Sequence, residues 1–166
     1  MRTKILSLFA ASLLLAACET TPQTTAGSGG GGAAAAPAAT AAPRTGPVPG
    51  SQQDLVVNVG DRVFYDYNKS DLKPEARRTL ERQAAWLKQY GSAAVTIEGH
   101  ADERGTREYN LALGDRRANA ARDYLVSLGI PAARVRTISY GKERPAVLGS
   151  NEAAYSQNRR GVTVVN

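Results

Sequence analysis

The sequence has only one cysteine and one histidine among its 166 residues. A lone cysteine, Cys18, cannot form an internal disulfide, and a lone histidine, His100, has no second ligand cluster with which to build a metal site. No serine stands in the sharp turn of a covalent hydrolase. The most apolar stretch, residues 5–15, is shorter than the roughly 20 residues that span a bilayer as a helix. These absences disfavour a metalloenzyme, a nucleophilic hydrolase and a transmembrane protein.

Charge is distributed unevenly along the chain. Of its 21 lysines and arginines and 15 acidic residues, only three basic and one acidic residue precede residue 51. The part beyond carries both signs in comparable numbers, which does not indicate a nucleic-acid-binding protein despite a pI of about 9.7. The nucleic-acid alternative rests on the pairs Arg116-Arg117 and Arg159-Arg160, and steep salt-dependent DNA binding would support it.

The N-terminus has the pattern of a secretion signal. A basic tip, Arg2 and Lys4, is followed by the apolar residues 5–15 and then by small residues. The segment Leu15-Ala16-Ala17-Cys18 resembles the bacterial lipobox, which implies cleavage before Cys18 and acylation of its thiol. The alternative is an ordinary secretory signal in which Cys18 is incidental. Two or three acyl chains would hold the protein firmly on a membrane, because each buried methylene contributes roughly 0.8 kcal/mol.

The segment that follows has the composition of a linker. Residues 20–50 are rich in Gly, Ala, Pro and Thr and have almost nothing to bury, so we expect a flexible tether. The chain therefore divides into a signal peptide at 1–17, a lipidated cysteine and linker at 18–54, and one folded domain at 55–166.

Periodicity in the folded part predicts five strands, four of them in the main sheet, and two helices. β-Branched and aromatic runs predict strands at 55–59 and 62–65, and alternation predicts strands at 94–100, 135–140 and 161–165, the run at 55–59 lying outside the main sheet. Pro74 and Gly91 bracket one helix at 74–90, and Gly114 and Gly129 bracket a second at 115–128. The order β-α-β-α-β-β predicts an α+β sandwich, a mixed sheet with both helices packed on one face.

Charged side chains crowd the predicted end of the 94–100 strand and the start of the second helix. Asp102 follows the strand and Arg117 is the third residue of the helix, so both can reach one rim of the domain. An arginine fork and the N–H groups of a helix N-terminus would hold a carboxylate, and an aspartate beside them would hold an ammonium. The pattern predicts a site for a zwitterion. The alternative from charge chemistry alone is a structural Asp102–Arg117 salt bridge.

Longer motifs in this region resemble a known family. The segments that carry the resemblance are Gly99-His100-Ala101-Asp102-Glu103-Arg104-Gly105-Thr106, Tyr109-Asn110, Leu113-Gly114-Asp115-Arg116-Arg117-Ala118-Asn119-Ala120, Ser139-Tyr140-Gly141-Lys142-Glu143-Arg144-Pro145-Ala146-Val147 and Asn158-Arg159-Arg160. Over residues 63–165 the chain resembles the OmpA C-terminal-like domain family, and within it the peptidoglycan-associated lipoproteins of the Tol–Pal system.

The resemblance implies a site and a ligand. Members of the family bind the meso-diaminopimelate of peptidoglycan, whose free D-centre is a zwitterion. By position, Asp102 corresponds to the residue that holds the ammonium and Arg117 to the one that holds the carboxylate. The remaining site residues implied are Asn110 as an amide partner, Leu113 by backbone or apolar contact, and Tyr65 and Asp66 lining the same site.

The resemblance also implies a biological role. It predicts a non-catalytic, monomeric outer-membrane lipoprotein that needs no cofactor or metal, faces the periplasm, and tethers the membrane to the cell wall during cell division. Its implied partners are peptidoglycan, TolB and the other Tol–Pal components. Glu19, the residue after Cys18, is acidic but is not the aspartate of inner-membrane retention. The alternatives left open are a peptidoglycan hydrolase and a periplasmic protein–protein interaction module. We expect Asp102→Ala or Arg117→Ala to weaken wall binding without unfolding the domain.

Overall fold

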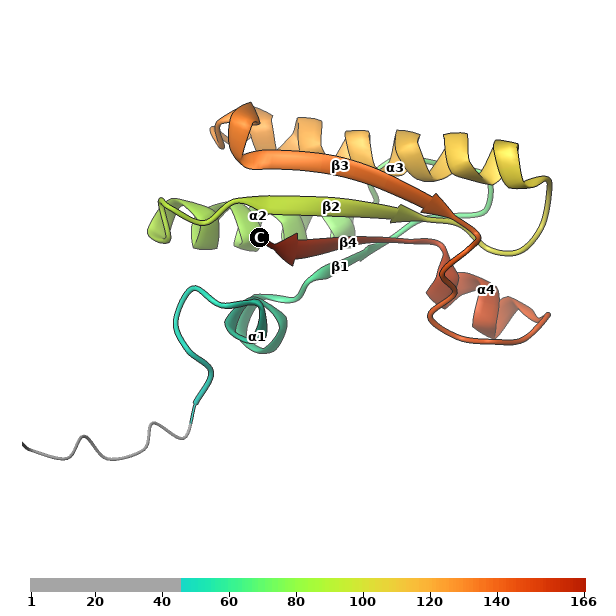
Figure 1. Ribbon diagram of the computed structural model, residues 1–166, viewed down its shortest axis with the longest axis horizontal. Coiled ribbons are helices and arrows are strands. Elements are labelled where there is room, and N and C mark those ends of the chain that lie inside the picture. The colour runs from blue at the N-terminus through green and yellow to red at the C-terminus, as the bar shows by residue number, and fades with distance from the viewer. Residues whose placement is uncertain (1–45) are drawn as a thin grey trace, which may run out of the picture. The chain divides into compact units, whose positions relative to one another are not determined.

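A computed structural model describes residues 46–166 (Figure 1). The expected signal peptide, Cys18 and most of the linker lie outside this range. The elements, in chain order, are α1 (Gln52–Asp54), the π-helix η1 (Leu55–Val59), β1 (Arg62–Phe64), α2 (Pro74–Gln89), β2 (Val95–His100), α3 (Arg107–Ser127), the 3-10 helix η2 (Ala132–Arg134), β3 (Val135–Gly141), α4 (Glu152–Asn158) and β4 (Arg160–Val165). No helix in this part of the chain is both long and apolar enough to cross a membrane.

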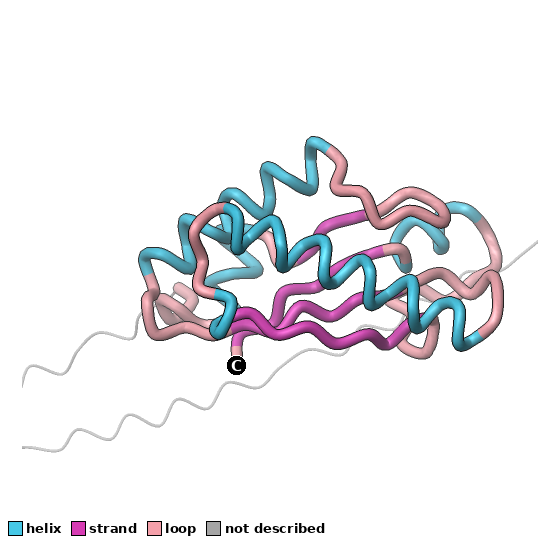
Figure 2. The backbone as a smooth tube through the Cα atoms, turned by 90° about the horizontal axis from the view of Figure 1, so that it is seen from above, coloured by secondary structure: helices cyan, strands magenta, loops and turns pink. Residues whose placement is uncertain are grey.

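The four strands form one mixed sheet in the order β1-β4-β2-β3. β4 runs antiparallel to both of its neighbours, whereas β2 and β3 are parallel. Viewed along the sheet, α2 and α3 lie together on one side of the strands (Figure 2). Val95 and Ile97 point from β2 into the core beneath these helices and are fully buried. The predicted α+β sandwich with a mixed sheet is confirmed.

The predicted strand at 55–59 is wrong, because this segment is helical. Ser51 caps α1, and Asp54 accepts hydrogen bonds from the backbone N–H of Gly50 and from Nε1 of Trp86, both at 2.9 Å. Leu55 is fully buried in the core. These tertiary contacts override the strand preference of the valines. The folded part therefore begins before Leu55, the expected domain boundary.

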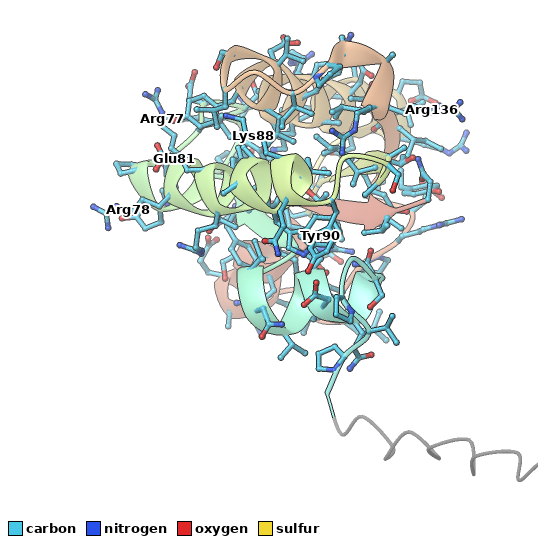
Figure 3. All side chains as sticks on the ribbon, turned by 90° about the vertical axis from the view of Figure 1, so that its left-hand side faces the viewer. Arg77, Arg78, Glu81, Lys88, Tyr90 and Arg136 are labelled. Atoms are coloured by element: carbon cyan, nitrogen blue, oxygen red, sulfur yellow. The ribbon has the colours of Figure 1, made fainter. Side chains whose placement is uncertain are left out.

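α2 agrees with the prediction except at its end. Its inner face buries Leu80, Ala84 and Leu87, as the spacing predicts. Gly91 does not supply a left-handed cap, since its φ is not positive. The helix ends at Gln89, and Tyr90 is its C-cap residue. Figure 3 shows Tyr90 between α2 and the N-terminal helical segment, while Arg77 and Arg78 point away from the body.

α3 begins eight residues before the predicted start at 115. Thr106 caps it by accepting the N–H of Tyr109. Gly114 is therefore inside the helix, where a β-carbon would meet Oγ of Ser139 at 2.3 Å and the carbonyl oxygen of Gly99 at 2.8 Å. The helix contains this glycine because its backbone packs directly on β2, and the packing compensates for the helix propensity that glycine lacks.

The C-terminal third contains an element that the sequence did not indicate. β3 and β4 form as predicted, but α4 lies between them, capped by Asn151, so the order is not β-α-β-α-β-β. His100, at the end of β2, is only 1% exposed. The centroid of its ring lies 5.6 Å from that of the Tyr140 ring.

Candidate functional site

A polar cavity of about 140 Å³ lies just beyond the C-terminal end of β2. Its walls come from the loop after β1, the loop after β2 and the first half of α3. The lining residues are Tyr67, Asn68, Asp102, Arg104, Gly105, Tyr109, Asn110, Leu113 and Arg117. Four of the six residues expected to bind a ligand, Asp102, Asn110, Leu113 and Arg117, are thus brought together.

Arg117 forms the floor of the cavity. It is the largest fully buried side chain in the described structure. Its guanidinium donates to three main-chain carbonyls: Nε to Lys69 at 2.8 Å, Nη1 to His100 at 2.8 Å and Nη2 to Asp66 at 3.0 Å. Burial lowers the pKa of Arg117 to about 10, so the side chain is still positive at neutral pH. Two of its five N–H groups are left over from the bonds to these carbonyls and can serve a ligand carboxylate.

The position of Arg117 differs from the expected one. Because α3 starts at Arg107, Arg117 lies well inside the helix rather than in its first turn. The N–H groups at the helix N-terminus therefore do not reinforce it. The positive charge for a carboxylate comes from the guanidinium itself.

Asp102 is nearly as buried as Arg117, at 4% exposed. Its ion pairs within residues 46–166 are with Nη2 of Arg104 at 2.6 Å and Nη1 of Arg159 at 3.3 Å. The alternative of a structural Asp102–Arg117 salt bridge is therefore wrong. Burial alone would raise the pKa of Asp102, but the hydrogen bonds from the two arginines outweigh burial and lower it. The carboxylate is ionised at neutral pH.

Asn110 and Leu113 occupy one face of α3 beside the cavity. Nδ2 of Asn110 donates to the carbonyls of Arg104 at 2.9 Å and Thr106 at 3.1 Å, which ties the loop after β2 to the helix. The side-chain oxygen of Asn110 stays available as an acceptor. Leu113, 5% exposed, supplies an apolar wall.

Tyr65 and Asp66 were expected to line the site, but they support it from behind. The Tyr65 hydroxyl donates to the backbone oxygen of Arg117 at 2.7 Å, and the Arg117 guanidinium lies 5.3 Å from the Tyr65 ring centroid. The Asp66 carboxylate turns outward to Nζ of Lys73 at 2.6 Å, so only its carbonyl faces Arg117. Neither residue lines the cavity, because Lys73 and the buried face of α3 draw their side chains elsewhere.

Several lining residues were not predicted from the sequence. Tyr67 and Asn68 belong to the loop after β1, and the Tyr109 hydroxyl donates to the side-chain oxygen of Asn68 across the mouth. Gly105 has a φ of 94°, a conformation that favours glycine, where the chain turns toward α3. The signal for these residues was a polar, aromatic loop directly after a predicted strand. Among residues 46–166, His, Cys, Asp and Glu side chains form no group of three that could hold a metal.

The fold and the cavity define a class of protein. It is a small α+β domain with one buried acidic residue and one buried arginine in the same pocket at the end of its sheet. The OmpA family model matches residues 64–159. The chain belongs to the OmpA family, and the resemblance of its motifs is confirmed.

Relatives narrow the comparison. The chain is 60% identical over 117 residues to the peptidoglycan-associated lipoprotein of Agrobacterium fabrum, a match covering 70% of this chain and 66% of that relative, slightly under two thirds. It is 50% identical over 117 residues to the peptidoglycan-associated lipoprotein of Pseudomonas aeruginosa, covering 70% and 69%. The crystal structure of the peptidoglycan-associated lipoprotein from Burkholderia pseudomallei matches with 40% identity and a TM-score of 0.62, covering 64% of this chain and 90% of that one.

Proposed function

We propose that the cavity binds the free D-centre of meso-diaminopimelate in peptidoglycan, as a non-enzymatic attachment to the cell wall. The observation that carries this is the presence of a buried carboxylate and a buried guanidinium on one small pocket without a bond between them. Arg117 would hold the ligand carboxylate and Asp102 its ammonium, because each charge needs an opposite partner. Asn110 and Leu113 would flank the ligand.

The family supports binding over catalysis. Close relatives are named for their association with peptidoglycan, and the OmpA family is a family of binding domains. His100, the only histidine, is buried beneath Tyr140, and burial lowers its pKa to about 4, which suits neither an acid nor a base at neutral pH. A hydrolase is the weaker alternative, and release of soluble muropeptides from sacculi would be needed to support it.

The sequence pattern supplies the other end of the attachment. Acylation of Cys18 would anchor the chain in the outer membrane, and the relatives are named lipoproteins. The linker would then let the domain reach the wall, where many weak sites act together. Mass spectrometry of the mature N-terminus tests this: an unacylated Cys18 would remove the anchor.

The resemblance of the motifs to the peptidoglycan-associated lipoproteins of the Tol–Pal system supports a role in that system. We place this domain in the Tol–Pal system, with TolB competing against peptidoglycan for it during envelope constriction. Purified TolB should then release the domain from sacculi in a dose-dependent manner. Simultaneous binding of TolB and sacculi would contradict the competition.

The central test is co-sedimentation of the purified full chain, in detergent, with isolated sacculi. Asp102→Asn removes the charge while keeping the side-chain shape, and should weaken binding about 10-fold or more, as expected for a lost charge-assisted hydrogen bond. The matched control is Asp123→Asn on α3, whose side chain is 74% exposed and is not among the residues that line the cavity. The stem tripeptide L-Ala-γ-D-Glu-meso-diaminopimelate should compete. If Asp102→Asn pellets like the parent, Asp102 does not hold a ligand ammonium and a protein becomes the better candidate ligand.

A further inference from the structure

The Asp102 carboxylate is already occupied from within the chain. Nη2 of Arg104 lies 2.6 Å from Oδ2, Nε of Arg104 lies 3.3 Å from Oδ1, and the Arg104 backbone N–H donates to Oδ1 at 3.2 Å. Arg159 approaches Oδ2 at 3.3 Å from the other side. A ligand ammonium that approaches this carboxylate must therefore enter a space that a guanidinium already fills.

Aromatic rings hold Arg104 in this place. Its guanidinium carbon lies 4.1 Å from the ring centroid of Tyr67, in the loop after β1, and 4.3 Å from that of Tyr155, on α4. Contacts at this distance are attractive cation–π interactions. The rings attract the charge without fixing a single hydrogen-bonded position, so Arg104 can shift between them while keeping their support.

A second acceptor for Arg104 is within reach. Oε2 of Glu152, also on α4, is 3.8 Å from Nη2 of Arg104. The other oxygen of Glu152 binds Arg159, which keeps the carboxylate in place. The Arg104 side chain is 34% exposed, against 5% for Asp102, so its outer end can move while Asp102 cannot. A short swing toward Glu152 would leave Asp102 open to the cavity.

We propose that Arg104 competes with the ligand for Asp102. In the empty site the Arg104 guanidinium pairs with Asp102, and the ligand ammonium displaces it toward Glu152. This proposal rests on the proposed function, since it needs a zwitterionic ligand. An ammonium within hydrogen-bond distance of Asp102 would lie close to the guanidinium, and like charges at that separation repel. A ligand with only a carboxylate leaves the Arg104–Asp102 pair intact.

Displacement sets both the strength and the selectivity of binding. Breaking the Arg104–Asp102 ion pair offsets part of the attraction between Asp102 and the ligand ammonium. The affinity for the ligand is therefore moderate, and the ligand dissociates easily. The preference for an ammonium-bearing stem over one without it is also reduced by the same amount. Removing the Arg104 charge should therefore strengthen binding of the zwitterion and widen the preference.

The experiment measures affinities of two tripeptides by calorimetry for the purified full chain in detergent. One is L-Ala-γ-D-Glu-meso-diaminopimelate, and the other carries 2-aminopimelate in place of the diaminopimelate, so that the distal carboxylate remains without its ammonium. The variant is Arg104→Met, which keeps an unbranched apolar chain against the tyrosines. Arg107→Met, whose partner Glu143 lies 3.4 Å away outside the cavity, is the matched control.

We expect Arg104→Met to bind the diaminopimelate peptide about 1.5-fold to fivefold more tightly, the range for a partly exposed ion pair. Binding of the aminopimelate peptide should stay unchanged or weaken. Glu152→Gln should weaken binding of the first peptide in the parent chain but not in Arg104→Met, because only the parent needs the second acceptor. Should Arg104→Met fail to fold, Arg104→Lys, which keeps the charge but loses the planar fork, should show a smaller change in the same direction.

Two results would overturn the proposal while leaving the proposed function intact. Equal weakening of both peptides in Arg104→Met would make Arg104 a support for the loop. Tighter binding of both peptides by the same factor would show that the ligand ammonium does not compete with Arg104. If the parent chain bound neither peptide, the proposed function would be wrong, and the proposed competition by Arg104 would be wrong as well.

Discussion

Arg117→Ala should destabilise the domain, contrary to what the sequence led us to expect. The side chain ties two segments together, since it donates to the carbonyls of Asp66 and Lys69 in one loop and of His100 at the end of β2. Hydrogen bonds that involve a charged group contribute at least about 1.5 kcal/mol each, so three of them total roughly 4–5 kcal/mol. Water entering the emptied cavity recovers part of this, which leaves a loss of about 3–4 kcal/mol.

A loss of that size is a large share of the roughly 5–15 kcal/mol by which domains are stable. It should lower the melting temperature by about 10–20 °C. Urea unfolding can be followed by the fluorescence of Trp86, the only tryptophan, which is 5% exposed in the core. The denaturant slope should not change, because the surface exposed on unfolding is the same.

Arg116→Ala is the matched control for this prediction. Arg116 neighbours Arg117 on α3 but is exposed, and its one described aromatic contact is with the Tyr109 ring at a long 5.9 Å. Its replacement should change stability by no more than about 0.5 kcal/mol. If Arg117→Ala were also within about 1 kcal/mol of the parent, the carbonyl contacts would not hold the loops. Weaker wall binding by Arg117→Ala is therefore informative only once folding has been measured.

Two further outcomes test the packing beneath the site. Gly99→Ala should lower the free energy of unfolding in urea by about 3 kcal/mol or more, because its β-carbon would lie 1.8 Å from the carbonyl oxygen of Gly114. Gly91→Ala, whose β-carbon would have nothing within 4 Å, should leave stability nearly unchanged. Equal effects of the two substitutions would contradict the close contact between α3 and β2. Burial lowers the pKa of His100 to about 4, whereas the unfolded chain takes up this proton near pH 6.5. Stability should thus fall from pH 6.5 to pH 4 by about 2–3 kcal/mol, and His100→Phe should lose most of that slope between pH 6.5 and 5. An unchanged slope would mean that other groups cause it.

The fold was predictable where side-chain periodicity agrees with tertiary packing. Val95 and Ile97 alternate in the sequence and are buried in β2, and Leu80 and Leu87 mark the inner face of α2. The strand prediction for residues 55–59 was wrong because their conformation depends on the hydrogen bond from Trp86 to Asp54, and Trp86 is 32 positions away from Asp54. A contact at that separation leaves no local signal.

The sequence predicted most residues of the site but not the ion pairs between them. Asp102 and Arg117 share the cavity, as expected from a charged strand end beside a charged helix. Which arginine pairs with Asp102 could not be read from the sequence, because the choice depends on α4, an element without a clear pattern. Asp66 was misplaced for a similar reason, since Lys73 draws its carboxylate outward.

The pairing of the N-terminal segment with β4 has a mechanical consequence. The Gln52 side chain accepts the N–H of Val165 at 2.7 Å and donates to the carbonyl of Thr163 at 3.3 Å, at the far end of β4, while Arg159 at its near end holds Asp102. Figure 1 shows α1 beside the C-terminus and α4 at the opposite end of the sheet. A pull between the cavity and the chain that enters at Gln52 therefore runs lengthwise along β4. Its ladders to β1 and β2 would be loaded in shear, all bonds together, rather than opened one at a time.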